Sequence, residues 1–283
     1  MRGALRTLLA GAAALIGAAT AHAAAPKAPA DMRLYVLDCG YIKVTDPRVL
    51  PFFGVTMEDL GGNADMPVTC YLIHHGSDWL MFDAGNGDWR HGVPPEIIAG
   101  MVYEAPKTVA DQLKAIGIAP ADVNWLAVSH YHLDHVGNVP LFPNARLLIQ
   151  RKELDATLAD PPPFTPAASV LRLTKPGVVP VDGEKDVFGD GTVVLEPTPG
   201  HTPGHQSLLV RLPHTGSVIL SGDLYHYAAE LKLHKMSDRE RGGETPASRA
   251  KIEALAAKEH APIWIEHDLA GFNSLKKAPD FYD

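Results

Sequence analysis

The sequence His130-Tyr131-His132-Leu133-Asp134-His135 places four metal-binding side chains within six residues. Imidazole and carboxylate ligands in this mixture suit zinc and its first-row neighbours. One ion cannot readily take all four ligands from so short a stretch, so we expect His130 and His132 to share one ion. Asp134 and His135 are then expected to share a second ion beside it. Two ions roughly 3.5–4 Å apart form a hydrolytic centre, which holds a hydroxide nucleophile and polarises the bond under attack. Taken alone, the stretch could also be a surface histidine cluster.

Three further candidate ligands, His201, Asp223 and His267, follow short apolar runs, as His130 does. Such runs, closed by turn residues, are typical of buried strands. The four runs span residues 125–129, 193–197, 217–222 and 262–266. Each candidate therefore lies at or just beyond the C-terminal end of a predicted strand, which is where layered α/β folds usually place their sites. A core histidine is the simpler interpretation of His201 or His267 taken singly, but four such strand ends argue against coincidence.

In this order the residues resemble the metallo-β-lactamase-fold hydrolases, whose pattern is His-x-His-x-Asp-His followed by a His, an Asp and a His. The resemblance covers residues 32–275. It implies an α/β fold of the four-layer αββα type, with a two-metal site at one edge of the two sheets. It also implies two divalent ions, with zinc as the default and Mn, Co or Fe as alternatives. The implied ligands are His130, His132 and His201 for the first metal, Asp134, His135 and His267 for the second, and Asp223 as the bridge.

Longer segments resemble one branch of that fold, the N-acyl homoserine lactone lactonases. They are SHYHLDHVGN at 129–138, PGHTPGHQSL at 199–208, GDLYHY at 222–227 and IEHD at 265–268. The implied activity is opening of a five-membered lactone ring by a metal-bridging hydroxide, which would quench quorum signals. Antibiotic-hydrolysing members usually carry Cys or Ser at the bridging position, so Asp223 sets this chain apart from them. Other lactones, aryl esters and organophosphate triesters suit the same centre and stay as alternative substrates. A non-catalytic metal-binding or scaffold protein is the third hypothesis.

The resemblance also suggests roles around the metals. Asp134 is the expected proton shuttle to the departing alkoxide, because it lies beside the hydroxide while it ligates a metal. Known lactonases often place a Tyr three residues after the bridging Asp, but that position is His226 here. We therefore expect Tyr225 to be the donor on the oxyanion side, with simple packing of both Tyr225 and Tyr227 as the alternative. His205 is expected to support the ligands without binding metal.

Asp83, in Phe82-Asp83-Ala84-Gly85, matches an early Asp of the family. We expect it to orient a ligand histidine through a hydrogen bond. An ordinary turn aspartate is the alternative.

The N-terminus predicts export. Arg2 and Arg6 precede a small-residue apolar stretch, and Ala21-His22-Ala23 is an A-x-A cleavage site. Residues 1–23 are thus a predicted signal peptide cleaved after Ala23, which implies a periplasmic or secreted protein with no stable membrane anchor after cleavage. We expect a flexible segment at 24–31 and one hydrolase domain at 32–283.

The composition points to the kind of partner. The net charge of −8 argues against nucleic acid, because a phosphate backbone attracts a basic face. A small-molecule lactone or ester is the expected partner. Relatives of this fold are often dimers, so a homodimer is a further expectation.

Two cysteines, Cys39 and Cys70, end one predicted strand at 33–38 and begin another at 69–73. If these strands pair antiparallel in an oxidising compartment, a disulfide can form; two buried thiols are the alternative.

Helices are predicted from Thr108 to Gly117 and from Thr245 to about residue 258. Surface loops are predicted at 160–166 and 237–244. The apolar residues within 44–67 are either core or a substrate-covering lid.

Overall fold

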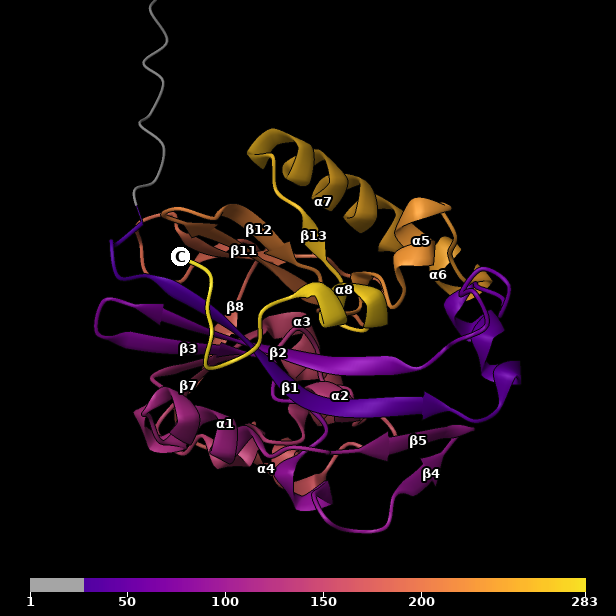
Figure 1. The fold of residues 1–283 in the computed structure, drawn as a ribbon, viewed down its shortest axis with the longest axis horizontal. Helices are drawn as coiled ribbons and strands as arrows, with labels where there is room; N and C mark the ends of the chain where they lie inside the picture. Colours follow the sequence, from indigo (N-terminus) through magenta and orange to yellow (C-terminus); the bar gives the residue numbers. More distant parts are fainter. Residues whose placement is uncertain (1–27) are drawn as a thin grey trace, which may run out of the picture.

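The computed structural model describes residues 28–283, which form two β-sheets with helices on their outer faces (Figure 1). The predicted signal peptide at 1–23, and residues 24–27 of the segment that follows it, lie outside the described residues. Among the helices of residues 28–283, none combines the length and the apolar composition needed to cross a membrane.

The first sheet has eight strands in the order β4-β5-β1-β2-β3-β6-β7-β8. Its strands are β1 (Arg33–Val44), β2 (Met66–His75), β3 (Asp78–Phe82), β4 (Glu96–Ile98), β5 (Met101–Glu104), β6 (Trp125–Ala127), β7 (Arg146–Gln150) and β8 (Val178–Val181). The pairs from β3 through β6 and β7 to β8 are parallel. The polar stretch that follows β6 therefore leaves the sheet at the carboxyl ends of these parallel strands.

The second sheet has five strands in the order β13-β12-β11-β10-β9. They are β9 (Lys185–Asp186), β10 (Val193–Pro197), β11 (Gln206–Leu212), β12 (Gly216–Leu220) and β13 (Ile263–Trp264). Strands β10 and β12 each end shortly before a predicted ligand, as the sequence pattern predicted, and β13 lies parallel to β12.

Within residues 28–283, eight α-helices accompany the sheets. They are α1 (Val109–Ile116), α2 (Leu133–Val136), α3 (Arg151–Ala159), α4 (Ala167–Arg172), α5 (Ala228–Lys232), α6 (Asp238–Arg241), α7 (Thr245–Glu259) and α8 (Leu269–Ser274). In Figure 1, α1 and α4 lie on one side of the molecule and α7 on the opposite side, with the sheets between them. The two predicted helices are confirmed as α1 and α7, and the Thr108 side chain caps α1 by accepting a hydrogen bond from the Asp111 backbone N–H.

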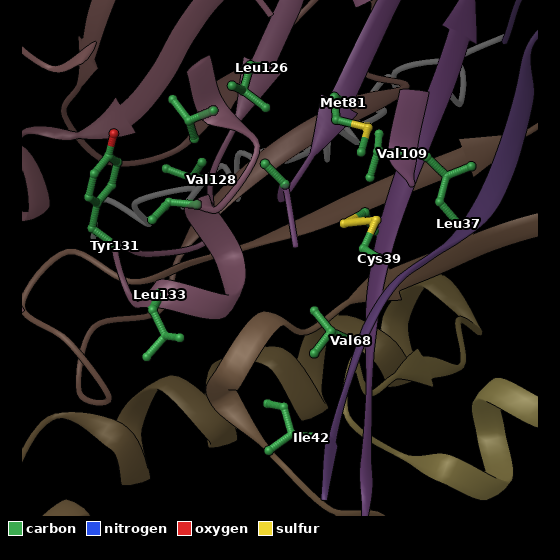
Figure 2. Close-up of a cluster of buried hydrophobic side chains, with 14 of the residues drawn as sticks. Leu37, Cys39, Ile42, Val68, Met81, Val109, Leu126, Val128, Tyr131 and Leu133 are labelled. Carbon is green, nitrogen blue, oxygen red and sulfur yellow. A yellow bond between two sulfur atoms is a disulfide. The ribbon is translucent and has the colours of Figure 1, made fainter. Parts of the chain in front are cut away.

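The helices and the two sheets form four layers, with a buried apolar cluster between each neighbouring pair. Each sheet contributes to two clusters, because successive side chains of a strand point to opposite faces. On β11, Leu208 and Val210 belong to the cluster between the sheets, whereas Leu209 packs towards Ile252 of α7. On β1, Leu37 faces the third cluster, which includes Val109 of α1; Figure 2 shows part of it. This is the predicted αββα sandwich.

The cysteines lie on neighbouring strands and form a disulfide. Strands β1 and β2 pair antiparallel, with Leu37 opposite Cys70 and an irregular register between Asp38 and Gly40. The Cα atoms of Cys39 and Cys70 are 5.8 Å apart and their sulfur atoms are bonded. Of the two alternatives drawn from the sequence, the structure has the bridged one.

Two segments differ from the simple expectations. Residues 237–244, predicted as a surface loop, contain α6, and the Glu240 side chain in it is buried. A Gly- and charge-rich sequence favours a loop, but Ser237 caps this short helix by accepting a hydrogen bond from the Glu240 backbone N–H. In the 44–67 segment, Phe53 and Val55 are buried in the core whereas Phe52 is exposed, so the segment supplies both core and surface. Residues 160–166 lie between α3 and α4 and form a loop, as predicted.

Candidate metal centre

All seven predicted ligands come together beyond the C-terminal ends of strands from both sheets. His130 follows β6, while His132, Asp134 and His135 lie in or beside the short helix α2. His201 follows β10. Asp223 follows β12 and His267 follows β13. Two groups with ligand atoms close enough to hold an ion are His130, His132, His201 and Asp223, and Asp134, His135 and His267.

In the first group the histidine nitrogens converge tightly. Nδ1 of His132 lies 2.9 Å from Nε2 of His130 and 3.0 Å from Nε2 of His201. Oδ2 of Asp223 lies 3.5 Å from Nε2 of His130 and 3.3 Å from Nε2 of His201.

The second group meets the other oxygen of the same carboxylate. Oδ1 of Asp223 lies 3.2 Å from Nε2 of His135 and 3.1 Å from Nε2 of His267. Oδ2 of Asp134 lies 3.6 Å from Nε2 of His267 and 3.8 Å from Nε2 of His135. One carboxylate thus presents an oxygen to each group, which is the arrangement expected of a bridging ligand.

Two of these histidines are held through their other ring nitrogen by groups outside the centre. Nδ1 of His267 lies 2.8 Å from the Pro67 carbonyl oxygen, and Nδ1 of His201 lies 3.3 Å from Oε1 of Glu240. Holding one nitrogen fixes the orientation of the ring and frees the other nitrogen to bind a metal.

The predicted Asp83 hydrogen bond is present. Oδ2 of Asp83 lies 3.1 Å from Nδ1 of His135, and its Oδ1 accepts a hydrogen bond from the Ser129 backbone N–H. The same carboxylate therefore orients a candidate ligand and fixes the chain just before His130.

Burial sets the charges of the centre. It lowers the pKa of His132 and of His201 to about 3, so these imidazoles are neutral at neutral pH. Burial would raise the pKa of Asp223, but the surrounding histidines, His135 foremost, hold that pKa well below its usual range. Burial would also lower the pKa of His135, but the carboxylates around it, Asp223 foremost, raise that pKa. A metal ion would need a neutral His135 beside the ionised Asp223, so metal binding here would release the His135 proton.

The residues fit a pair of divalent cations. Nε2 of His135 and Oδ1 of Asp223 are buried and have no hydrogen-bond partner within residues 28–283. Buried polar atoms normally have a partner, so this pair indicates a ligand that the protein itself does not supply. A mixed nitrogen and oxygen donor set suits zinc and related first-row ions.

A cavity of about 190 Å³ opens directly onto the centre. Its polar floor includes His132, Asp134, His201, Asp223 and His267. Its other walls are mostly apolar and come from Ile42, Phe52, Phe53, Met66, Ile98, Ala99, Met101, Tyr103, Leu133, Pro163 and Phe164, with His226 beside the floor.

The structure corrects the assignment of Tyr225. Its hydroxyl donates a hydrogen bond to Oε1 of Glu253 at 2.7 Å, and its ring lies under the guanidinium of Arg249 in the cluster beneath α7. Tyr225 has extended backbone dihedrals. Side chains of successive extended residues point to opposite sides, so the next residue, His226, faces the cavity instead.

Nε2 of His226 lies 3.4 Å from Oδ2 of Asp223. Its backbone N–H donates to Oε1 of Glu230, whose other oxygen accepts from Arg249. His205 lies behind the bridge: its Nε2 accepts a hydrogen bond from the Asp223 backbone N–H, which agrees with the predicted supporting role.

Sequence reasoning missed Glu240 and Tyr103. Glu240 contacts Nδ1 of His201 from a segment with the composition of a loop. Tyr103 reaches the cavity from β5, where no motif marks it. Tyr103 is opposite Ile42 in the β1–β5 pair, so its place in the cavity follows only once the pairing of these two strands is known.

Comparison with known proteins is consistent with this geometry. The family model of the metallo-beta-lactamase superfamily matches residues 64–265. The N-acyl homoserine lactonase AttM of Azorhizobium caulinodans is 33% identical over 276 residues, which cover 89% of this chain and 99% of that protein.

Two solved structures share the fold. The crystal structure of a B. thuringiensis AiiA mutant with N-decanoyl-L-homoserine bound at its active site has a TM-score of 0.72 at 22% identity, and covers 88% of this chain and 98% of that one. AidC, described as a dizinc quorum-quenching lactonase, has a TM-score of 0.63 at 21% identity, and covers 89% of this chain and 93% of that one. The solved structures share the fold, whereas the family model and the 33% identity to AttM show that the chain is a hydrolase of the metallo-beta-lactamase superfamily and belongs to its N-acyl homoserine lactonase family.

Proposed function

We propose that this protein opens the lactone ring of N-acyl homoserine lactones with two divalent metal ions, most simply zinc. The proposed ligands of the first ion are His130, His132 and His201, those of the second are Asp134, His135 and His267, and Asp223 bridges them. The observation that carries the proposal is the Asp223 carboxylate, whose two oxygens face two separate ligand groups at the base of an apolar cavity.

The reaction needs a nucleophile, a polarised carbonyl and a proton for the leaving group. When bound, the two ions would supply hydroxide at neutral pH and polarise the ring carbonyl. Attack at the carbonyl carbon breaks the ring C–O bond, and the departing alkoxide then takes a proton. Asp134 is the proposed carrier of that proton, because it lines the cavity beside the other candidate ligands.

The apolar walls of the cavity are suited to the acyl chain of such a substrate. Phe53, Met66 and Met101 give it an apolar lining, and the exposed rings of Phe52 and Phe164 extend that lining to its mouth. Burial of an acyl chain against such a surface contributes roughly 0.8 kcal/mol for each CH₂ group. The named activity of AttM agrees with this substrate class.

We also propose that the protein is exported, on the strength of the signal-peptide pattern at residues 1–23. The Cys39–Cys70 disulfide agrees with an oxidising compartment. A homodimer stays a prediction, and gel filtration with light scattering would test it.

A ring-opening assay tests the proposed activity. The purified, metal-loaded protein would be incubated with short- and long-chain acyl homoserine lactones, and mass spectrometry would follow the addition of one water. We expect a ring-opened product that disappears after chelation and returns when zinc is restored. An intact lactone in the presence of fully metal-loaded protein would contradict the proposal, and would direct the search to aryl esters and phosphotriesters.

A further inference from the structure

Tyr103 is the only tyrosine among the described residues that line the cavity. It lies on β5, and the alternation of side chains along that strand places it on the same face as Met101. Its partner across the sheet is Ile42 of β1, which also lines the cavity. The sheet itself therefore directs the Tyr103 ring into the cavity.

The backbone of Tyr103 is held from both sides. Strand β5 pairs with β1 and with β4, where Glu96 is opposite Tyr103. Glu96 also accepts a hydrogen bond from Arg90, whose guanidinium lies 5.8 Å from the centre of the Tyr103 ring. A ring held in this way can present its hydroxyl in a fixed position.

The hydroxyl of Tyr103 is free, unlike those of the tyrosines that pack around the site. Tyr131 donates to the Ser169 carbonyl, Tyr225 to Glu253 and Tyr227 to the Ala64 carbonyl. Within residues 28–283, the Tyr103 hydroxyl makes no hydrogen bond, although only 5% of the residue is exposed. Since Tyr103 lines the cavity, a molecule bound there is the natural acceptor for its hydroxyl.

Tyr103 shares its cavity with the candidate ligands Asp134 and Asp223. Burial, and next the charges of Asp134 and Asp223, raise the pKa of Tyr103. A phenol, with an ordinary pKa of about 10, already keeps its proton at neutral pH and can donate a hydrogen bond.

We propose that Tyr103 donates a hydrogen bond to the ring carbonyl oxygen of the bound lactone and stabilises the negative charge that develops there. The inference rests on the proposed lactonase function and adds a catalytic residue to it. No covalent bond to Tyr103 forms or breaks, because the phenol contributes only a hydrogen bond that strengthens as the carbonyl oxygen gains charge.

Tyr103→Phe is the decisive variant, because it removes only the hydroxyl. Tyr225→Phe is the matched control, since its hydroxyl bonds to Glu253 away from the cavity. The wild type and both variants would be compared on one acyl homoserine lactone for kcat, KM, bound metal and Tm. We expect Tyr103→Phe to lower kcat about 100-fold, in the range for loss of one donor to a developing oxyanion, with little change in KM. Bound metal and Tm should stay at the wild-type values, and Tyr225→Phe should keep wild-type kcat.

Other results would overturn the inference. Wild-type kcat in Tyr103→Phe, a change confined to KM, or a loss of bound metal would each exclude this role. If the wild type opens no acyl homoserine lactone, the proposed function fails on its own. The same comparison would then be made on whichever aryl ester the enzyme hydrolyses, where an undiminished kcat in Tyr103→Phe overturns the inference and a lowered kcat supports it.

Discussion

Nε2 of His205 accepts a hydrogen bond from the backbone N–H of Asp223 at 3.0 Å. An accepting Nε2 places the ring proton on Nδ1, which lies 3.1 Å from the Thr198 carbonyl oxygen. His205 therefore ties the end of β10 to the turn that carries the bridging carboxylate. The turn has little room to adjust, because a Cβ on Gly222 would lie 2.8 Å from Nε2 of His205.

His205→Ala should weaken the metal centre without removing a ligand. It leaves the buried Asp223 N–H without a partner and frees the turn, so we expect a loss of roughly 10–100-fold in metal affinity or activity, as for other groups that orient ligands. Metal titration and kcat/KM would measure it. His214→Ala, at an exposed histidine remote from the centre, is the control. A folded His205→Ala protein with wild-type metal affinity and activity would disprove this role.

Phe164 should set the preference for long acyl chains, because its exposed ring lines the cavity mouth. Phe164→Ala removes apolar surface, and loss of about 1–2 kcal/mol of burial corresponds to a fall of roughly 5- to 30-fold in kcat/KM. The fall should appear with long-chain lactones and be small with short-chain ones. Leu171→Ala is the matched control, since Leu171 is similarly exposed but lies outside the lining. Equal losses for both chain lengths would rule out this placement of the chain.

The disulfide should stabilise the strands behind the centre. It links residues 31 apart in sequence, and the Cys39 carbonyl accepts a hydrogen bond from the Asn86 N–H close to Asp83. Replacing both Cys39 and Cys70 by Ala should lower the free energy of unfolding by about 3 kcal/mol. Urea denaturation with and without reductant would measure it: reductant should destabilise the wild type and leave the double variant unchanged. Equal stability of the two oxidised proteins would contradict this prediction.

The sequence predicted the layers and the ligand groups because both depend on local patterns. Apolar runs that end at His130, Asp223 and His267 indicate strands whose ends carry polar residues, and the structure places both histidines against the Asp223 carboxylate. Tyr225 and His226 could not be told apart in this way. Both follow Asp223 closely, and the backbone conformation alone decides which of them faces the cavity.

Tyr103 and Glu240 were not predicted, because they reach the site through contacts between segments far apart in the sequence. Tyr103 enters the cavity because β5 pairs with β1, across a separation in sequence that no short motif spans. Glu240 lies in a segment with the composition of a loop and becomes a partner of His201 only when α6 packs beside α7. Contacts of this kind depend on tertiary packing, and local composition does not encode them.

The proposed role of Asp223 is to join two metal ions into one hydrolytic centre, and counting bound metal alongside activity is the sharpest check of that role. Bound metal per chain and lactone turnover would be measured together for the wild type and for Asp223→Ala. We expect two ions per active wild-type chain, and reduced metal content with no measurable turnover in Asp223→Ala. A folded Asp223→Ala protein with two ions and wild-type turnover would contradict it.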